Sequence, residues 1–118
     1  MERGARTPEE LETLLEDAFV IRDAHALGEL FESGGVLAGG DALEARGENI
    51  AGLASALWHG DHTYVADPRR ILQARDTALI VAERGINVAR RGRDGIWRYA
   101  IALLSLDHTT KQPRQKGR

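Results

Sequence analysis

Apolar and polar positions alternate in a pattern that predicts two helices before any strand. Over residues 11–19, leucine, alanine and phenylalanine recur at spacings of three and four, which places them on one face of a helix. Thr7 to Glu10 marks its start, with a threonine cap, a proline in the first turn and a glutamate that can close a capping box. The acidic residues between the apolar positions are expected to point away from the core: Glu12, Glu16 and Asp17.

A second, short helix is predicted after Asp23, which can cap it. Its apolar residues Leu27, Leu30 and Phe31 repeat the helical spacing, and the stretch Ser33-Gly34-Gly35 is expected to end it. A third helix is predicted over residues 50–58. Two short strands are predicted between the second and third helices, at residues 36–38 and 43–45.

After residue 60 the pattern changes to that of strands. Tyr64 to Ala74 reads as one strand despite Pro68, and Arg75-Asp76 as a turn. A long β-hairpin is predicted from Ala78 to Arg90 and from Ile96 to Asp107, with a glycine-containing loop between its arms. The expected order is therefore helix, helix, short hairpin, helix and three long strands, which is an α+β arrangement.

The register of the long hairpin decides which polar side chains share a face. With residues 91–95 as the loop, Asn87 would lie opposite Tyr99 and Glu83 opposite Leu103, all on one face. The other face would be mostly apolar and is expected to form the core. Its members are Ile80, Ala82, Ile86, Val88, Ala100, Ala102, Leu104 and Leu106, interrupted by Arg84 and Arg98.

Length and composition are those of a soluble, single-domain protein. Its 118 residues and 42% apolar content suit one domain with one core. The net charge of −2 gives no general attraction for nucleic acid or for an anionic membrane surface. There is no cysteine, and no run of the roughly 20 apolar residues needed to span a bilayer. We therefore expect a soluble cytoplasmic protein that binds neither nucleic acid nor membrane.

Four short segments, in the order and spacing that they have here, resemble a known family: Thr7-Pro8-Glu9-Glu10-Leu11, Leu30-Phe31-Glu32-Ser33-Gly34-Gly35-Val36-Leu37, Ala45-Arg46-Gly47 and Gly95-Ile96-Trp97-Arg98-Tyr99-Ala100-Ile101. They look like the NTF2-like superfamily, particularly its SnoaL-like and DUF4440 branches. The resemblance implies a cone of three helices packed against a curved, mostly antiparallel sheet, with a pocket between them and commonly a homodimer packed through the sheet. We expect this domain over residues 7–107, after a flexible N-terminus at 1–6 and before a basic, disordered tail at 108–118.

Two positions depart from what relatives of this kind often carry. Where many of them continue the tryptophan strand with polar residues, this chain has Ala102-Leu103-Leu104, which can neither transfer a proton nor donate a strong hydrogen bond. Gly34 stands where relatives often place an aspartate. Both departures lower the expectation of acid–base chemistry.

Candidate site residues follow from the shared hairpin face. A carboxylate in an apolar cavity can act as a general acid or base, and Glu83 is the expected base, with Tyr99 in support. Asn87, Trp58, Tyr64 and Trp97 are the candidate ligand contacts. The alternative is that this face meets solvent or a second copy of the chain, so that Glu83 and Asn87 are simply solvated.

Two other patterns do not indicate a metal or cofactor site. The segment His59-Gly60-Asp61-His62 has metal-binding residue types but lacks further fixed ligands, so no metal is expected. The glycines at 34, 35, 39, 40 and 47 are not framed as a nucleotide-binding unit, so no cofactor is expected.

Three functions from different classes remain open. The first is a dimeric module that binds a small, mostly apolar molecule with little or no catalysis. The second is an isomerase, cyclase or dehydratase that uses Glu83 or a histidine as its base, and the third is an interaction module whose pocket is filled.

Overall fold

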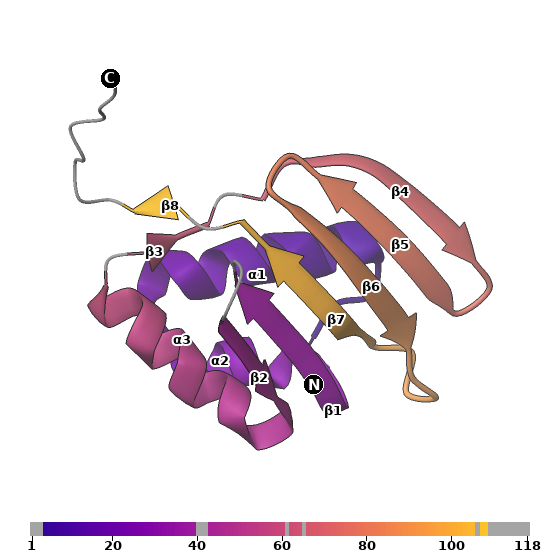
Figure 1. Cartoon of the computed structure of the whole chain (residues 1–118). Coiled ribbons are helices and arrows are strands. Elements are labelled where there is room, and N and C mark those ends of the chain that lie inside the picture. The colour runs from indigo at the N-terminus through magenta and orange to yellow at the C-terminus, as the bar shows by residue number, and fades with distance from the viewer. Residues whose placement is uncertain (1–3, 40–42, 61, 65, 106, 109–118) are drawn as a thin grey trace.

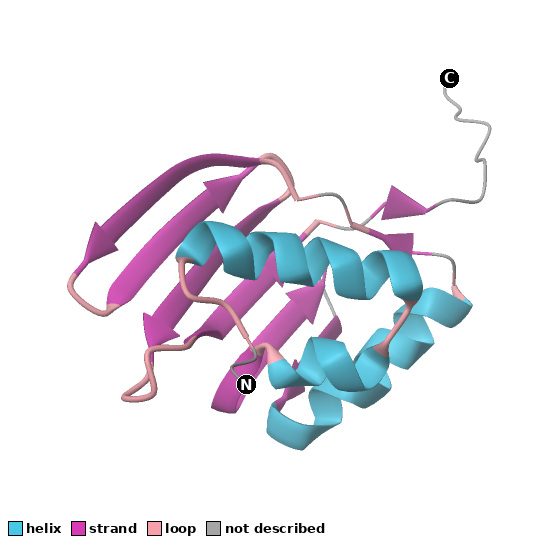
Figure 2. Ribbon diagram, turned by 180° about the vertical axis from the view of Figure 1, so that it is seen from behind, coloured by secondary structure: helices cyan, strands magenta, loops and turns pink. Residues whose placement is uncertain are grey.

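A computed structural model describes residues 4–39, 43–60, 62–64, 66–105 and 107–108. Within them, the helices α1 (Pro8–Ile21), α2 (Ala24–Glu29) and α3 (Ile50–His59) lie on one side of a six-stranded curved sheet (Figures 1 and 2). The order of strands across the sheet is β2-β1-β7-β6-β5-β4, and a separate pair is formed by β3 and β8. The strands are β1 (Phe31–Gly39), β2 (Leu43–Arg46), β3 (His62–Thr63), β4 (Pro68–Ala74), β5 (Thr77–Ala82), β6 (Gly85–Arg91), β7 (Trp97–Leu104) and β8 (Asp107–His108), with a 3₁₀ turn at Gly47–Asn49. The predicted α+β class is confirmed.

Both predicted helix starts are confirmed. The Thr7 hydroxyl accepts a hydrogen bond from the Glu10 N–H at 3.0 Å, and the Asp23 carboxylate accepts one from the Ala26 N–H at 3.0 Å. The predicted end of the second helix is wrong, because α2 stops at Glu29 and Phe31 already belongs to β1. Gly34 and Gly35 lie inside that strand, where its pairing with β7 is irregular.

The predicted first arm of the long hairpin is two strands instead of one. A two-residue turn at Glu83 and Arg84 separates β5 from β6, which pair from Thr77 opposite Arg90 to Ala82 opposite Gly85. Neither turn residue is of a type that favours a tight turn, so the sequence pattern continued through it. As a result, β4, β5, β6 and β7 form an antiparallel series, and β7 also pairs in parallel with β1.

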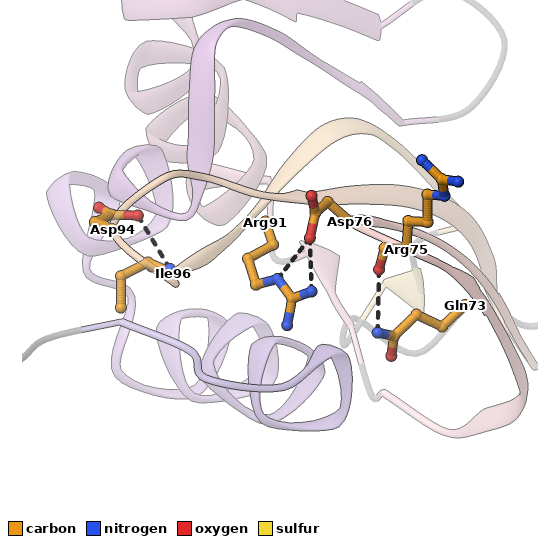
Figure 3. A network of polar contacts seen from close by, with 6 residues as sticks. All are labelled: Gln73, Arg75, Asp76, Arg91, Asp94 and Ile96. Atoms are coloured by element: carbon orange, nitrogen blue, oxygen red, sulfur yellow. Dashed lines mark hydrogen bonds and ion pairs between the residues drawn. The ribbon is translucent and has the colours of Figure 1, made fainter.

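The loop between β6 and β7 covers residues 92–96, one residue later than predicted, and polar contacts hold it. The Ile96 N–H donates to the Asp94 carboxylate at 3.0 Å (Figure 3). The Arg98 guanidinium donates to the same carboxylate at 2.8 Å. The Arg98 guanidinium, and next the Ile96 N–H, lower the pKa of Asp94 to about 2. Arg91 ties the loop to the neighbouring β4–β5 turn through Asp76, at 2.6 Å.

The predicted register of this hairpin is wrong: Asn87 lies opposite Ala102 and not opposite Tyr99. Two positions of this shift come from the loop, because Arg91 pairs with Trp97 as part of β6, and the third comes from a β-bulge. Val88 lies opposite Ile101 but Ala89 lies opposite Tyr99, so Ala100 is an extra residue in β7. Side chains alternate strictly between the two faces only in a regular strand. The bulge exchanges the faces, so that odd-numbered residues of β7 face inward before it and even-numbered residues after it. Consequently Trp97 and Tyr99 face the core before the bulge, and Ala102 and Leu104 face it afterwards.

The core lies between α1 and the inner face of the sheet. Leu11, Leu15 and Phe19 of α1 are buried there, as predicted. Ile86, which was predicted to be a core residue, is 50% exposed on the outer face. Ala5 is fully buried and its carbonyl accepts a hydrogen bond from the Trp97 N–H at 2.9 Å, so the packed structure includes this residue before position 7. Of the predicted tail, residues 109–118 lie outside the described residues.

Candidate functional site

Glu12 is the most unusual buried residue of the fold. It lies on α1, it is 1% exposed, and its side chain points into the core between helix and sheet. Its Oε2 atom accepts a hydrogen bond from the Tyr99 hydroxyl at 2.5 Å and another from Asn87 Nδ2 at 2.9 Å. A carboxyl group is thus held by two donors from neighbouring strands, β7 and β6. We call Glu12, Asn87 and Tyr99 the carboxyl cluster.

Local structure accounts for the position of each member of the carboxyl cluster. Glu12 precedes Leu15 by three residues and Phe19 by seven, so helical geometry places all three on one side of α1. Tyr99 faces inward because it precedes the bulge in β7, opposite Ala89. Asn87 faces inward two residues along β6 from Ala89, and both polar strand residues are fully buried.

Burial is the largest effect on the pKa of Glu12. Desolvation raises its pKa, while the hydrogen bonds from Tyr99 and then Asn87 act in the opposite direction and are weaker. No arginine or histidine in the described part of the chain forms an ion pair with Glu12. Burial also raises the pKa of Tyr99, with the Glu12 charge and its hydrogen bond adding to the effect. The cluster therefore favours a neutral carboxyl and a neutral phenol.

Several polar atoms at and near the carboxyl cluster have no hydrogen-bond partner. They are Glu12 Oε1, Asn87 Oδ1, the Tyr64 hydroxyl and Trp58 Nε1, all of them buried. Burial and then the Glu12 charge raise the pKa of Tyr64, and the nearby Asn87 side chain acts in the opposite direction, so the Tyr64 hydroxyl lies beside the cluster without meeting hydrogen-bond geometry. Buried polar atoms are nearly always paired in folded proteins, so a group of unpaired ones calls for an explanation.

Aromatic side chains continue from Tyr64 away from the carboxyl cluster. The Phe19 ring lies 5.9 Å from the Tyr64 ring, centroid to centroid, and 5.5 Å edge-on from the Trp58 ring. Trp58 also borders a surface hollow of about 440 Å³, whose other lining residues are Arg22, Ser55 and His59. The site thus has a polar inner end and an apolar aromatic side.

The structure brings together some of the residues predicted from sequence and separates others. Asn87 and Tyr99 both contact Glu12, and Tyr64 and Trp58 lie nearby as described. Glu83 does not join them: the prediction that it shares their face is wrong, because it lies in the β5–β6 turn, where its carboxylate pairs with Arg69 at 2.7 Å. Trp97 is buried near the opposite loop, where the Arg91 guanidinium lies 5.3 Å from its ring centroid.

The sequence interpretation missed Glu12, which it expected to point away from the core. A signal existed, since its spacing to Leu15 and Phe19 is that of the apolar face. Acidic residues are almost never fully buried unless they are paired, so spacing alone does not predict the burial of a glutamate. Its partners, Asn87 and Tyr99, lie more than 70 residues away in the chain.

Among the described residues, no group of three or more acidic or histidine side chains could hold a metal ion. His59 Nδ1 lies 2.9 Å from the Ser55 carbonyl of its own helix. Asp61 lies outside the described residues. In the described part of the chain, no helix has both the length and the apolar character needed to cross a membrane.

No model of a known protein family matches the sequence, and no curated protein matches it either. Solved structures do match the fold. A putative calcium/calmodulin-dependent protein kinase type II association domain from Thiobacillus denitrificans aligns with 88% of this chain and 98% of its own, at 17% identity and a TM-score of 0.73.

Two further structures carry names from one fold group. A ketosteroid isomerase-like protein from Erwinia carotovora atroseptica aligns with 83% of this chain and 92% of its own, at 18% identity and a TM-score of 0.68. An NTF2-like protein with a cystatin-like fold from Novosphingobium aromaticivorans aligns with 86% of this chain and 80% of its own, at 22% identity and a TM-score of 0.66. The chain therefore has the NTF2-like, cystatin-like fold.

Proposed function

We propose that the protein binds a small, mostly apolar molecule, whose one polar group is recognised by the carboxyl cluster. The observation that carries this proposal is the set of unpartnered atoms, Glu12 Oε1, Asn87 Oδ1 and the Tyr64 hydroxyl, gathered in one buried region. A bound polar group would supply their missing partners, and the rings of Phe19 and Trp58 would contact the apolar body.

Energetics support the proposal. An unpaired buried polar atom costs about 1–3 kcal/mol, so several together lower stability noticeably unless something restores their hydrogen bonds. Function often explains such local costs, because a binding site must hold polar groups ready for a partner that is absent from the free protein. Ordered water is the competing occupant, since buried waters commonly make about three hydrogen bonds to such groups.

Titration with two probes of matched shape tests the proposal. Cyclohexanol carries one hydroxyl, whereas cyclohexane carries none. We expect cyclohexanol to shift the NMR signals of the Asn87 side-chain amide and of the Glu12 carboxyl, and cyclohexane to leave them nearly unchanged. A panel of small alcohols, amides and amines that produces no shift at either group would contradict the proposal.

A second candidate function is acid–base catalysis, as in an isomerase, cyclase or lyase. In this function the base would be Glu12 instead of Glu83, because Glu12 is the buried carboxyl with a raised pKa and an unpartnered oxygen. A buried carboxyl with a raised pKa can both take and give a proton. Exchange of the α-protons of cyclohexanone in heavy water, accelerated by the native chain and not by Glu12→Gln, would support it over binding alone.

We also propose that the protein is a homodimer packed through the outer face of its sheet. Leu72, Leu79, Val88 and Ile101 lie directly opposite one another across four strands, and Val81, Ile86 and Leu103 form a second row. Five of these seven side chains are 38–50% exposed. An aliphatic surface of this kind is typical of a protein interface, and a dimer with a filled interior would be the interaction module considered above.

Membership of the SnoaL-like or DUF4440 branch and a cytoplasmic location are proposals as well. The four sequence segments support the first. The second is supported by the low net charge and by the lack of a long apolar run in the sequence.

A further inference from the structure

β4 is an edge strand that is open along its length. It lies at one end of the sheet, where β5 pairs with one side of it and no described strand pairs with the other (Figure 1). Six of its seven residues are exposed, and Ile71 is half-buried. β2, the strand at the other edge, has four residues and contacts α3. β4 therefore presents the longer row of unpaired backbone groups.

The turn that ends β4 indicates which of its backbone groups face outward. This turn has two residues, so the residues next to it, Ala74 and Thr77, form a hydrogen-bonded pair. Such pairs alternate along antiparallel strands with pairs that exchange no hydrogen bond. Ile71 and Gln73 belong to pairs of the second kind, so their N–H and C=O groups point away from β5. An added strand would form its hydrogen bonds with these two residues.

Arginine side chains at the two ends of β4 make this edge cationic. Arg70, near its start, and Arg75, just after its end, are both exposed. In the described part of the chain, neither forms an ion pair with an acidic residue. The Arg75 guanidinium points away from Asp76, whose carboxylate binds Arg91 instead (Figure 3). A strand that pairs with β4 therefore gains electrostatic energy if it carries acidic residues.

The same arginines disfavour a second copy of β4 as the partner. Antiparallel pairing of two copies would set Arg69 and Arg70 of one strand against Arg75 of the other, and like charges opposite each other destabilise a sheet. The C-terminal sequence of the chain is unsuited as well, because residues 109–118 contain four basic residues and no acidic one. The partner that fits is an acidic segment of a different protein.

We propose that β4 binds an extended acidic segment of another protein, which adds a strand to the edge of the sheet. The inference is independent of the proposed ligand site. In antiparallel pairing, the partner residue opposite Leu72 is apolar, because Leu72 is 48% exposed and gains burial there. The partner residue two positions later lies opposite Arg70, and the residue three positions earlier lies near Arg75. Both of these are acidic, so the segment has the pattern acidic-x-x-apolar-x-acidic.

Two peptides of matched shape, blocked at both ends, test this inference on the full chain. The sequence Glu-Thr-Thr-Val-Thr-Glu carries the expected pattern, and Lys-Thr-Thr-Val-Thr-Lys reverses its charge. At low ionic strength we expect the acidic peptide to shift the backbone amide NMR signals of Ile71 and Gln73, and to bind at least about tenfold more tightly than the basic peptide. Equal binding of the two peptides, or no shift at either residue, would overturn the inference. Slow amide exchange at both residues in the free protein would also overturn it, because a second copy would then already cover the edge.

Two variants with the same change of charge separate pairing at β4 from general attraction. Arg70→Glu should weaken binding of the acidic peptide at least about tenfold and strengthen binding of the basic one. Arg46→Glu, on β2 at the opposite edge of the sheet, should leave both affinities unchanged. Equal effects of the two substitutions would show attraction by net charge alone and would overturn the inference. Gln73→Pro removes an outward N–H at a kind of position where edge strands tolerate proline, and it should abolish binding of the acidic peptide. If a variant does not fold, the comparison of the two peptides on the native chain still decides.

Discussion

The Tyr99 hydroxyl donates a hydrogen bond to Glu12 Oε2 at 2.5 Å, and this contact links the last long strand of the sheet to the first helix. The two residues lie 87 positions apart in the chain, and both are buried. A short hydrogen bond to a carboxyl in a medium of low dielectric constant is stronger than the same bond in water, and its loss is correspondingly costly.

Tyr99→Phe should therefore lower the free energy of unfolding by about 1–3 kcal/mol, because it removes a donor from a buried carboxyl and changes little else. It should also raise the pKa of Glu12 further, since the hydrogen bond from Tyr99 acts to lower it. Urea denaturation measures the first effect and carbon-detected NMR the second.

Tyr64→Phe is the matched control for that variant. The Tyr64 hydroxyl is buried without a partner, so its removal should leave the free energy of unfolding unchanged or raise it by up to about 1 kcal/mol. If Tyr64→Phe costs as much stability as Tyr99→Phe, the hydroxyl has a partner and the proposed set of unpaired atoms is wrong.

Stability should depend on pH through Glu12. Its pKa in the folded protein is raised above the value in the unfolded chain, so the folded state binds the proton more tightly. This stabilising contribution is fully present below the pKa of the unfolded chain and is lost as pH rises through the folded pKa. Urea denaturation from about pH 4 to about pH 8 should show this loss in the native chain and not in Glu12→Gln. Equal pH dependence in the two proteins would show that Glu12 does not titrate as described.

Helical spacing and capping residues were sufficient to predict α1, α3 and the start of α2, because these signals are local. Local patterns could not predict which side chains of β7 face inward, because the bulge at Ala100 depends on how β7 pairs with β6. Asn87 and Tyr99 were therefore predicted to lie directly opposite each other, which is wrong. Both side chains nevertheless face the core. Glu83 was misassigned because the turn that contains it has no turn-forming residue before Gly85.

The outer face of the sheet should carry the dimer interface. Ile101→Lys places a charge among Leu79, Val88 and Leu103 and should convert the proposed dimer to a monomer, as measured by light scattering. Val20→Lys is the control, because Val20 is 74% exposed on α1 and lies away from that face. A native chain that is monomeric at micromolar concentration would exclude the dimer.

Replacing glycine by alanine at two positions, one crowded and one open, tests the packing of the fold. A Cβ added to Gly35 would lie 3.0 Å from the carbonyl oxygens of Glu32 and Tyr99, so Gly35→Ala should cost about 1–3 kcal/mol of stability. A Cβ added to Gly52 of α3 meets no heavy atom within 4 Å. Gly52→Ala should therefore stabilise the helix, by about 0.5–1 kcal/mol in urea denaturation. The reverse order of the two effects would contradict the described path of β1.

Carbon-detected NMR titration of the Glu12 carboxyl in the native chain tests the central claim most directly. That claim is that burial raises the pKa of the Glu12 carboxyl and that its Oε1 atom, unpartnered in the free protein, binds the proposed ligand. The titration should give a pKa clearly above that of an ordinary glutamate, which is about 4.3, and Tyr99→Phe should raise it again. A pKa at or below the ordinary value would mean that Glu12 is solvated or paired with a cation, and the proposed binding centre would be wrong.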